Sequence, residues 1–366
     1  MKTANSNPIR NANTRTQRGM ALIIVLVVIV VLSILAGRFA YQMKVETTLA
    51  RHASFSSELD WMGRGGVEVA KWVISAESQG PMGQLDSLKH KWAGGPGDSN
   101  SVVAAVDLKN YQLGRGTLSI DIKDLDRKFN INVADEVVLR QGLTLIGVDA
   151  GSLGGVVGAI QDWKDRDSDP HAGGAETQVY EQQNPPYICK DGPIDDMSEL
   201  LLIRGVTKNM FYGSAAGGQS AAFDRSLPFQ KSAFDEPTYA VGLQDLFTPL
   251  SGGLVNINTA SATVLQVMPE IDENIAQAII QARASPDGQD GTEDDTPFRS
   301  PQEFAGRVPG FVNPAAIAQL GRFFTVRSVV FEVHVTASIG SSRREYVAIL
   351  QRSSPKDIRT LNLYWK

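Results

Sequence analysis

"MALIIVLVVIVVLSILA", residues 20–36, is the stretch that decides the fold of this chain. Ser33 carries the only polar side chain among its 17 residues. As a helix this stretch is roughly 25 Å long, at about 1.5 Å per residue, which is near the lower limit for crossing a bilayer. The apolar core of a secretory signal is shorter, roughly 7–15 residues. We therefore expect a transmembrane helix over residues 20–36.

The segment before this helix carries positive charge and no negative charge, at Lys2, Arg10, Arg15 and Arg18. Basic flanks of a membrane span stay on the cytoplasmic side. The N-terminus is therefore expected inside the cell and the long C-terminal part outside the membrane.

Residues 37–79 continue the helical pattern beyond the membrane. Apolar residues lie at helical spacing with charges between them, at Phe39, Met43, Leu49, Leu59, Met62, Val69 and Val73. This pattern predicts an amphipathic stem that extends the same helix as far as Gly80-Pro81. Gly63, Gly65 and Gly66 are expected to weaken the stem, because each glycine costs up to about 1 kcal/mol relative to alanine.

Two later segments have the alternation of β-strands. Leu118, Ile120 and Ile122 alternate with polar residues, which predicts a half-buried strand. Residues 329–350 alternate on both sides of a turn at Gly340-Ser341-Ser342, which predicts a hairpin. Between them, residues 133–322 contain no clear strand.

The expected fold class is therefore α+β. A long N-terminal helix packs on a small antiparallel sheet, which residues 80–132 and 323–366 build together. A large all-α domain, residues 133–322, is inserted into that sheet.

The junction Arg18-Gly19-Met20, directly before the apolar helix, resembles the processing site of type IV pilins and type II secretion pseudopilins. In that family a dedicated prepilin peptidase removes a basic leader that ends in glycine. The resemblance implies a leader over residues 1–19, cleavage between Gly19 and Met20, and a methylated mature N-terminus. The family usually has glutamate at the fifth mature position, which is Ile24 here.

The missing glutamate is shared by one branch, the large K-type minor pseudopilins of type II secretion. The blocks DWKDRD (162–167), SELLLIRGVT (198–207) and VNINTA (255–260) also resemble this branch. The family glutamate is thought to be matched by the amine of a neighbouring subunit, and a tip subunit has no neighbour ahead of it. Ile24 therefore fits a tip position, although it also fits a residue that merely faces lipid.

The resemblance implies a pilin-like fold and a mechanical function. The chain would sit in the inner membrane with its bulk in the periplasm, and would initiate or cap the fibre that exports folded proteins across the outer membrane. Its implied partners are the I-type and J-type minor pseudopilins and the prepilin peptidase.

Two stretches of the insertion, 197–211 and 259–283, resemble helix-hairpin-helix units, and 301–320 is a weaker third copy. Such units raise an alternative function, a minor pilin of a type IV pilus or a DNA-uptake system. Phosphate-binding hairpins need glycine amides and basic residues at the turn. The best copy has Pro269, Glu270, Asp272 and Glu273 there, so we expect compact packing units and no nucleic-acid partner.

Two acidic loops are candidates for calcium, which takes 6–8 oxygen ligands in flexible geometry. The expected ligands are Asp165, Asp167, Asp169 and Glu176 in the first loop, and Asp287, Asp290, Asp294 and Asp295 in the second. Neither loop has the 12-residue EF-hand pattern, so a solvated acidic loop stays open as the alternative. Resemblance to K-type pseudopilins implies calcium in the insertion. A disulfide bracing such a loop is impossible here, because Cys189 is the only cysteine.

Composition and motifs argue against an enzyme. The net charge of −5 gives no general attraction for nucleic acid or anionic lipid. Asp165 and Asp167 could pair for acid–base catalysis, but no nucleophile elbow, zinc-binding histidine pair or phosphate loop accompanies them. We expect no catalytic residue and no small-molecule substrate.

Overall fold

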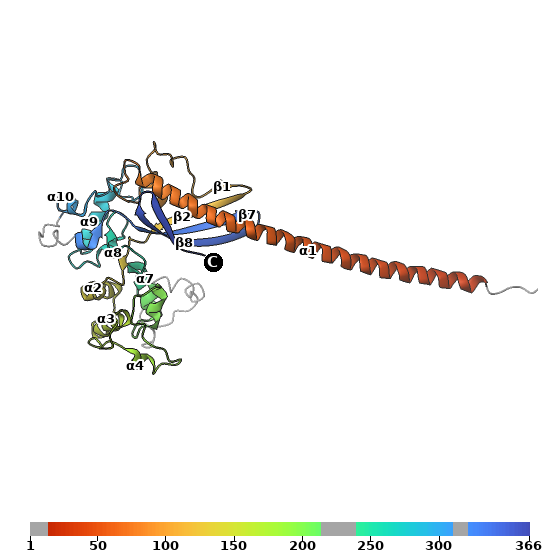
Figure 1. Cartoon of the computed structure of the whole chain (residues 1–366), viewed down its shortest axis with the longest axis horizontal. Helices are drawn as coiled ribbons and strands as arrows, with labels where there is room; N and C mark the ends of the chain where they lie inside the picture. Colours follow the sequence, from red (N-terminus) through yellow and green to blue (C-terminus); the bar gives the residue numbers. More distant parts are fainter. Residues whose placement is uncertain (1–13, 214–238, 310–320) are drawn as a thin grey trace, which may run out of the picture. The chain divides into compact units, whose positions relative to one another are not determined.

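The computed structural model describes residues 14–213, 239–309 and 321–366. The chain falls into two compact units, Met1–Trp61 and Met62–Lys366. A single helix, α1 (Thr14–Ser78), runs from the first unit into the second (Figure 1). The expected long N-terminal helix is therefore confirmed, with no break between its apolar part and its stem.

The first unit exposes its apolar side chains. Between Met20 and Leu35 the large apolar side chains are 48–71% exposed. This part of α1 is long and apolar enough to cross a membrane. Such a surface is stable where hydrocarbon, rather than water, surrounds it.

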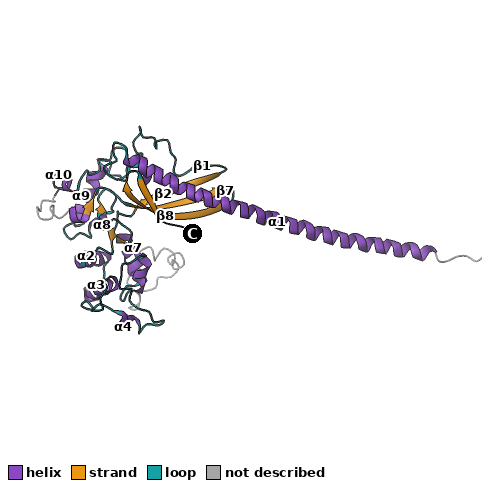
Figure 2. Cartoon of the chain, in the orientation of Figure 1, coloured by secondary structure: helices purple, strands orange, loops and turns teal. Residues whose placement is uncertain are grey.

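The second unit contains a five-stranded antiparallel sheet with the order β1-β2-β7-β8-β9 (Figure 2). Its strands are β1 (Tyr111–Leu113), β2 (Gly116–Asp124), β7 (Val330–Ile339), β8 (Ser342–Ser354) and β9 (Asp357–Trp365). The predicted β7–β8 hairpin is confirmed, and Gly340 at its turn has φ +58°. Strand β2 pairs with β7, so Asp124 lies opposite Phe331.

The stem glycines mark where α1 meets the sheet. A Cβ atom on Gly63 would lie 2.4 Å from the ring of Tyr346, and one on Gly66 would lie 2.4 Å from Cγ1 of Val335. On the same part of α1, Ala70, Val73 and Ile74 are fully buried. These two glycines therefore allow close packing, and their helix-weakening effect is the smaller part of their role.

We expect Gly66→Val to destabilise the second unit by about 3 kcal/mol, at the upper end of the range for overpacked cores. The added methyl groups overlap Val335, and the strand cannot move away without losing its pairing. Gly65→Ala is the matched control, because its Cβ would meet only the end of the Leu113 side chain, at 3.1 Å. Urea unfolding of the full chain in detergent measures both, and equal midpoints would contradict the close-packing role.

The chain between β2 and β7 is rich in short helices. The α-helices are α2 (Glu136–Ile146), α3 (Ala150–Lys164), α4 (Thr177–Tyr180), α5 (Lys208–Tyr212), α7 (Leu243–Leu246), α8 (Ala262–Leu265), α9 (Glu273–Ala284) and α10 (Phe304–Arg307). The 3₁₀ turns are η2 (Met197–Leu202) and η4 (Pro301–Glu303), and η1 (Lys91–Ala93) precedes β1. One continuous apolar core, which includes Trp163, Tyr180 and Phe298, joins most of these elements.

Residues 133–322 were expected to be all-α, but the structure has two short strands within them, each paired with a short strand just outside that range. Two parallel pairs form, β3 (Phe129–Asn130) with β4 (Phe247–Thr248) and β5 (Val255–Asn256) with β6 (Phe324–Thr325). Each strand has two residues, which is too short to produce a recognisable alternation in the sequence.

A buried polar network holds the ends of the insertion against the sheet. Arg352 of β8 forms a bidentate ion pair with Asp86, whose Oδ1 lies 3.1 Å from Nη1. Ser328 donates its N–H to Asp86 Oδ2 at 2.9 Å and its hydroxyl to Asp124 Oδ2 at 2.5 Å. Thr259 of the insertion donates to the same Asp124 oxygen at 2.6 Å. Burial raises the pKa of Asp124 to about 7, while these hydroxyl donors act in the opposite direction.

Candidate metal centre

The first acidic loop follows the C-terminal end of α3 and is organised by Asp162. This carboxylate is fully buried and accepts the N–H of His171 at 2.9 Å and the N–H of Ala175 at 2.6 Å. The imidazole Nδ1 of His171 lies 2.6 Å from the same carboxylate. Asp162 therefore folds residues 165–176 back toward α3.

The loop brings three of the four predicted ligands together. Asp165, Asp167 and Glu176 each offer a carboxylate oxygen, and these oxygens lie within 4.8 Å of one another. Asp169 is not in this group; it is exposed, and its N–H donates to Asp167 Oδ1 at 3.0 Å. A site here would therefore lack the fourth expected carboxylate.

Two oxygens of this group have unmet hydrogen-bonding capacity. Glu176 is 5% exposed, and its Oε1 has no hydrogen-bond partner among the described residues; Asp165 Oδ1 is also buried and unpartnered. Burial raises the pKa of both carboxyl groups, and neighbouring carboxylates, Asp162 foremost for Glu176, add to the shift. Buried carboxylates that repel one another and lack donors suit a hard divalent cation such as calcium.

Cys189 and Asp191 also belong to this region, and sequence reasoning missed both. Glu176, Cys189 and Asp191 offer ligand atoms within 4.8 Å of one another. Cys189 is buried, and burial raises its pKa to about 12, so the free thiol stays protonated. Asp191 has φ +50°, a backbone conformation uncommon for residues other than glycine. The Asp191-Gly192 turn was the only available signal.

The second acidic loop is arranged differently. Asp287, Asp294 and Asp295 offer oxygens within 4.8 Å of one another, as expected. Asp290 is instead paired with Arg283, at 2.6 Å and 2.9 Å. Arg283 also donates to the carbonyls of Ile257 and Ala260, so it is a buried structural residue that engages Asp290.

The oxygens of Asp295 are already satisfied by the loop itself. Oδ2 accepts the N–H of Gly291 at 2.7 Å, and Oδ1 accepts the hydroxyl of Thr292 at 3.0 Å. Lys89 donates to the carbonyls of Glu293 and Asp295, which ties the loop to the segment after α1. The second loop therefore makes a weaker case for a cation than the first.

The acidic residues of the turn between α8 and α9 also lie close together in the structure. Asp272 caps α9 by accepting the N–H of Ile275 at 2.8 Å, and Glu270 and Glu273 are exposed beside it. Ile271 is buried and fixes the turn to the core. Carboxylates face the place where a hairpin of this kind would receive phosphate, and they would repel it. Residues 310–320 of the third copy lie outside the described residues.

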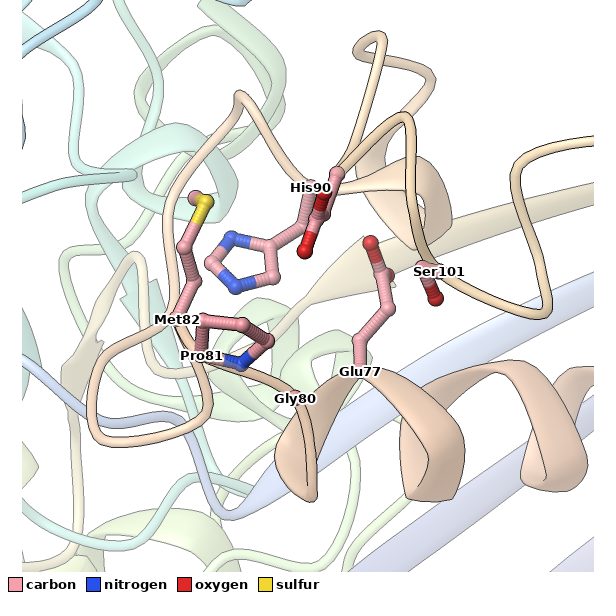
Figure 3. Close-up of a pocket in the computed structure, with 7 residues that line it drawn as sticks. Glu77, Gly80, Pro81, Met82, His90 and Ser101 are labelled. Carbon is pink, nitrogen blue, oxygen red and sulfur yellow. The ribbon is translucent and has the colours of Figure 1, made fainter.

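A small cavity lies at the C-terminal end of α1 (Figure 3). Its volume is about 20 Å³, and Glu77, Pro81, Met82 and His90 are among its lining residues. Glu77 accepts the N–H groups of Lys91 and Trp92 at 2.7 Å and 3.0 Å, which ties the helix end to the next segment. The space suits one water molecule and is far too small for a substrate.

The predicted processing residues lie within α1. The helix runs through the Gly19–Met20 junction without interruption. Ile24 is 59% exposed on the apolar part of the helix. Neither cleavage nor a tip position follows from these observations alone, so both stay predictions.

Comparisons with known proteins find relatives over most of the chain. Two domains described as "Type II secretion system (T2SS), protein K" match residues 119–212 and 255–327. Type II secretion system protein K of Pseudomonas aeruginosa is 25% identical over 362 residues, covering 95% of this chain and 92% of that protein. Its counterpart in Aeromonas hydrophila is 22% identical over 355 residues, covering 92% and 94%.

A solved structure has the same fold. It is the GspK-GspI-GspJ complex of the enterotoxigenic Escherichia coli type 2 secretion system. One of its chains matches with a TM-score of 0.61 and 15% identity, covering 87% of this chain and 99% of that chain. The likeness supports the combination of a long N-terminal helix with an antiparallel sheet.

Proposed function

We propose that this chain, whose residues 119–212 and 255–327 match the two domains of the type II secretion system protein K family, is a minor pseudopilin of that system and occupies the tip of the pseudopilus. There it initiates and caps the fibre that helps to export folded proteins across the outer membrane. The observation that carries the proposal is likeness over 95% of the chain to a protein K, which includes the apolar helix. The function is mechanical, and the chain catalyses no reaction.

Ile24 supports the tip position. An unmatched carboxylate within the membrane costs about 2.5–3.5 kcal/mol at a helix centre on insertion scales. In a shaft subunit, the N-terminal amine of the subunit ahead would offset this cost. A tip subunit has no subunit ahead of it, so its carboxylate would stay unpaired. An exposed isoleucine at the fifth mature position avoids the problem.

The same proposal assigns the partners and the location. The E. coli complex contains GspI and GspJ, and we propose the I-type and J-type pseudopilins as partners of this chain. Its apolar helix makes a single-pass anchor, which we place in the inner membrane with the bulk of the chain periplasmic. Prepilin peptidase acts on its leader. The acidic α8–α9 turn supports the absence of a nucleic-acid partner, and no small-molecule substrate is proposed.

A tip subunit should label one end of each fibre. We expect gold-labelled antibody against this chain to mark a single end of isolated pseudopili in electron micrographs, while antibody against the major pseudopilin marks their length. The full chain should also co-purify from detergent with the I-type and J-type subunits. Label distributed along the shaft would contradict the tip position.

We further propose calcium as the ligand of the first acidic loop. Asp165, Asp167 and Glu176 would hold it, and the ion would supply the positive charge that their buried oxygens lack. Carbonyl groups and water would complete the 6–8 ligands that calcium takes. The second loop, through Asp287, Asp294 and Asp295, is a weaker second candidate.

Calcium at a hundredfold excess over its Kd should raise the unfolding free energy by about 2.7 kcal/mol, because it binds only the folded state. Asp165→Asn and Glu176→Gln should remove most of this gain. Asp169→Asn is the matched control, because Asp169 is exposed and lies outside the group. Melting curves of the full chain with calcium, magnesium and chelator measure the effect, and magnesium should substitute poorly. Coincident curves would show that the loop is merely solvated.

A further inference from the structure

A thiol stands beside the proposed calcium ligands. Glu176, Cys189 and Asp191 form a second group of three ligand atoms, all within 4.8 Å of one another, and Glu176 belongs to both groups. Cys189 is 2% exposed, and its N–H donates to the hydroxyl of Thr177 at 3.1 Å. This bond fixes the cysteine next to the start of α4.

Two oxygens of the group are buried without hydrogen-bond partners among the described residues, Glu176 Oε1 and Asp191 Oδ1. Glu176 is the N-cap residue of α4, yet its side chain makes no capping bond. Asp191 holds an uncommon positive φ in the same place. Buried polar groups are normally paired, and the proposed calcium already accounts for Glu176, so the unpaired Asp191 Oδ1 beside the thiol points to an absent positive partner.

The mixed donor set distinguishes this group from a calcium site. Calcium takes oxygen ligands, whereas zinc and similar divalent metals accept thiolate, and carboxylate as well. Ligand atoms around tetrahedral zinc lie roughly 3.5 Å apart, given bond lengths of about 2.0–2.3 Å. The ligand atoms of Glu176, Cys189 and Asp191 lie at most 4.8 Å apart. Small side-chain movements would therefore bring them to the distances that zinc requires.

We propose that Glu176, Cys189 and Asp191 form a binding site for a thiol-accepting divalent metal of the zinc class, with a water in the fourth position. On binding, the metal replaces the proton of the Cys189 thiol, which passes to solvent. No electron transfer is involved. The site does not depend on calcium binding, but the shared Glu176 makes the two ions compete.

The competing explanation is that Cys189 is an ordinary buried thiol. Its Sγ lies 3.6 Å from the carbonyl oxygen of Asp162, within reach of a weak S–H donation. The Cys189 side chain also interacts with that of Asp191, but Asp191 Oδ1 and Glu176 Oε1 still have no hydrogen-bond partner among the described residues. A metal bound to all three accounts for the whole group.

Cobalt(II) tests the proposal, because it replaces zinc in such sites and a thiolate ligand gives it a charge-transfer absorption band. The chain has one cysteine, so a band from the full chain in detergent can come only from Cys189. We expect the band in the wild type, its displacement by zinc, and its loss in Cys189→Ser. The absence of a band with both cobalt and cadmium in the wild type would overturn the proposal.

Asp191→Gly and Asp169→Asn form the matched pair. Glycine tolerates φ +50° and removes only the carboxylate, so Asp191→Gly should weaken cobalt binding at least tenfold without loss of fold. Asp169→Asn should leave it unchanged, and equal affinities in the two variants would also overturn the site. Cys189→Ser should keep its calcium-dependent melting shift, so a failed zinc site and a failed calcium site give different results.

Discussion

Arg352→Ala is expected to destabilise the second unit by about 3–5 kcal/mol, the usual cost of removing one partner from a buried ion pair. The side chains of Arg352 and Asp86 are 3% and 5% exposed. Without the guanidinium, Asp86 stays buried with its negative charge, near Asp124 of the same network. Arg352 also donates to the carbonyl of Ser328, so the start of β7 would lose a second partner.

Arg359→Ala is the matched control for this prediction. Arg359 pairs with Asp357 at 3.1 Å, but the two side chains are 69% and 43% exposed. Exposed pairs contribute about 0–1 kcal/mol. Urea unfolding of the full chain, followed by tryptophan fluorescence, should show a large fall in midpoint for Arg352→Ala alone. Similar midpoints for the two variants would mean that the buried network does not hold the insertion to the sheet.

Gly19→Val should abolish removal of the leader, because the peptidase of this family requires a small residue before the cut. The uncut chain would keep its basic leader on the cytoplasmic side and would not enter the fibre. Intact-mass measurement of the membrane-extracted chain should give a mature N-terminus at Met20 for the wild type and the full-length precursor for the variant.

Gly37→Val controls for the effect of a branched residue in the same helix. A Cβ at Gly37 meets nothing within 4 Å, so this variant should be processed normally. A mature N-terminus at Gly37 in the wild type would instead indicate ordinary signal peptidase. That result would overturn the proposed processing and the assembly route that depends on it.

The long helix and the β7–β8 hairpin could be predicted because their patterns are strong. An uninterrupted apolar run and strict alternation around Gly340 each allow few alternatives. Strand β9 was not predicted, because its alternation of Leu361, Leu363 and Trp365 is short and most of its side chains are exposed. The close contacts of Gly63 and Gly66 could not be predicted either, since they depend on which strand side chains lie opposite.

The acidic loops could be located from sequence, but their ligand sets could not. Local spacing brought Asp165 and Asp167 together correctly. Asp290 was assigned to a metal because the sequence does not show that Arg283 is buried beside it. Cys189 and Asp191 lie close to Glu176 because the chain folds back around α4. This proximity depends on tertiary structure, so local sequence patterns do not predict it.

The pairing of β2 with β7 also constrains the order of folding. Asp124 and Phe331 are neighbours in the sheet, although the whole insertion separates them in the chain. Closing a flexible loop of this length costs about 5 kcal/mol of entropy, far more than closing the Gly340 turn. The β7–β8–β9 meander is therefore expected to form early, and β2 to join after the insertion has collapsed and brought its own ends together. Until then β7 presents an unpaired edge, which is the interval in which this chain is most exposed to aggregation.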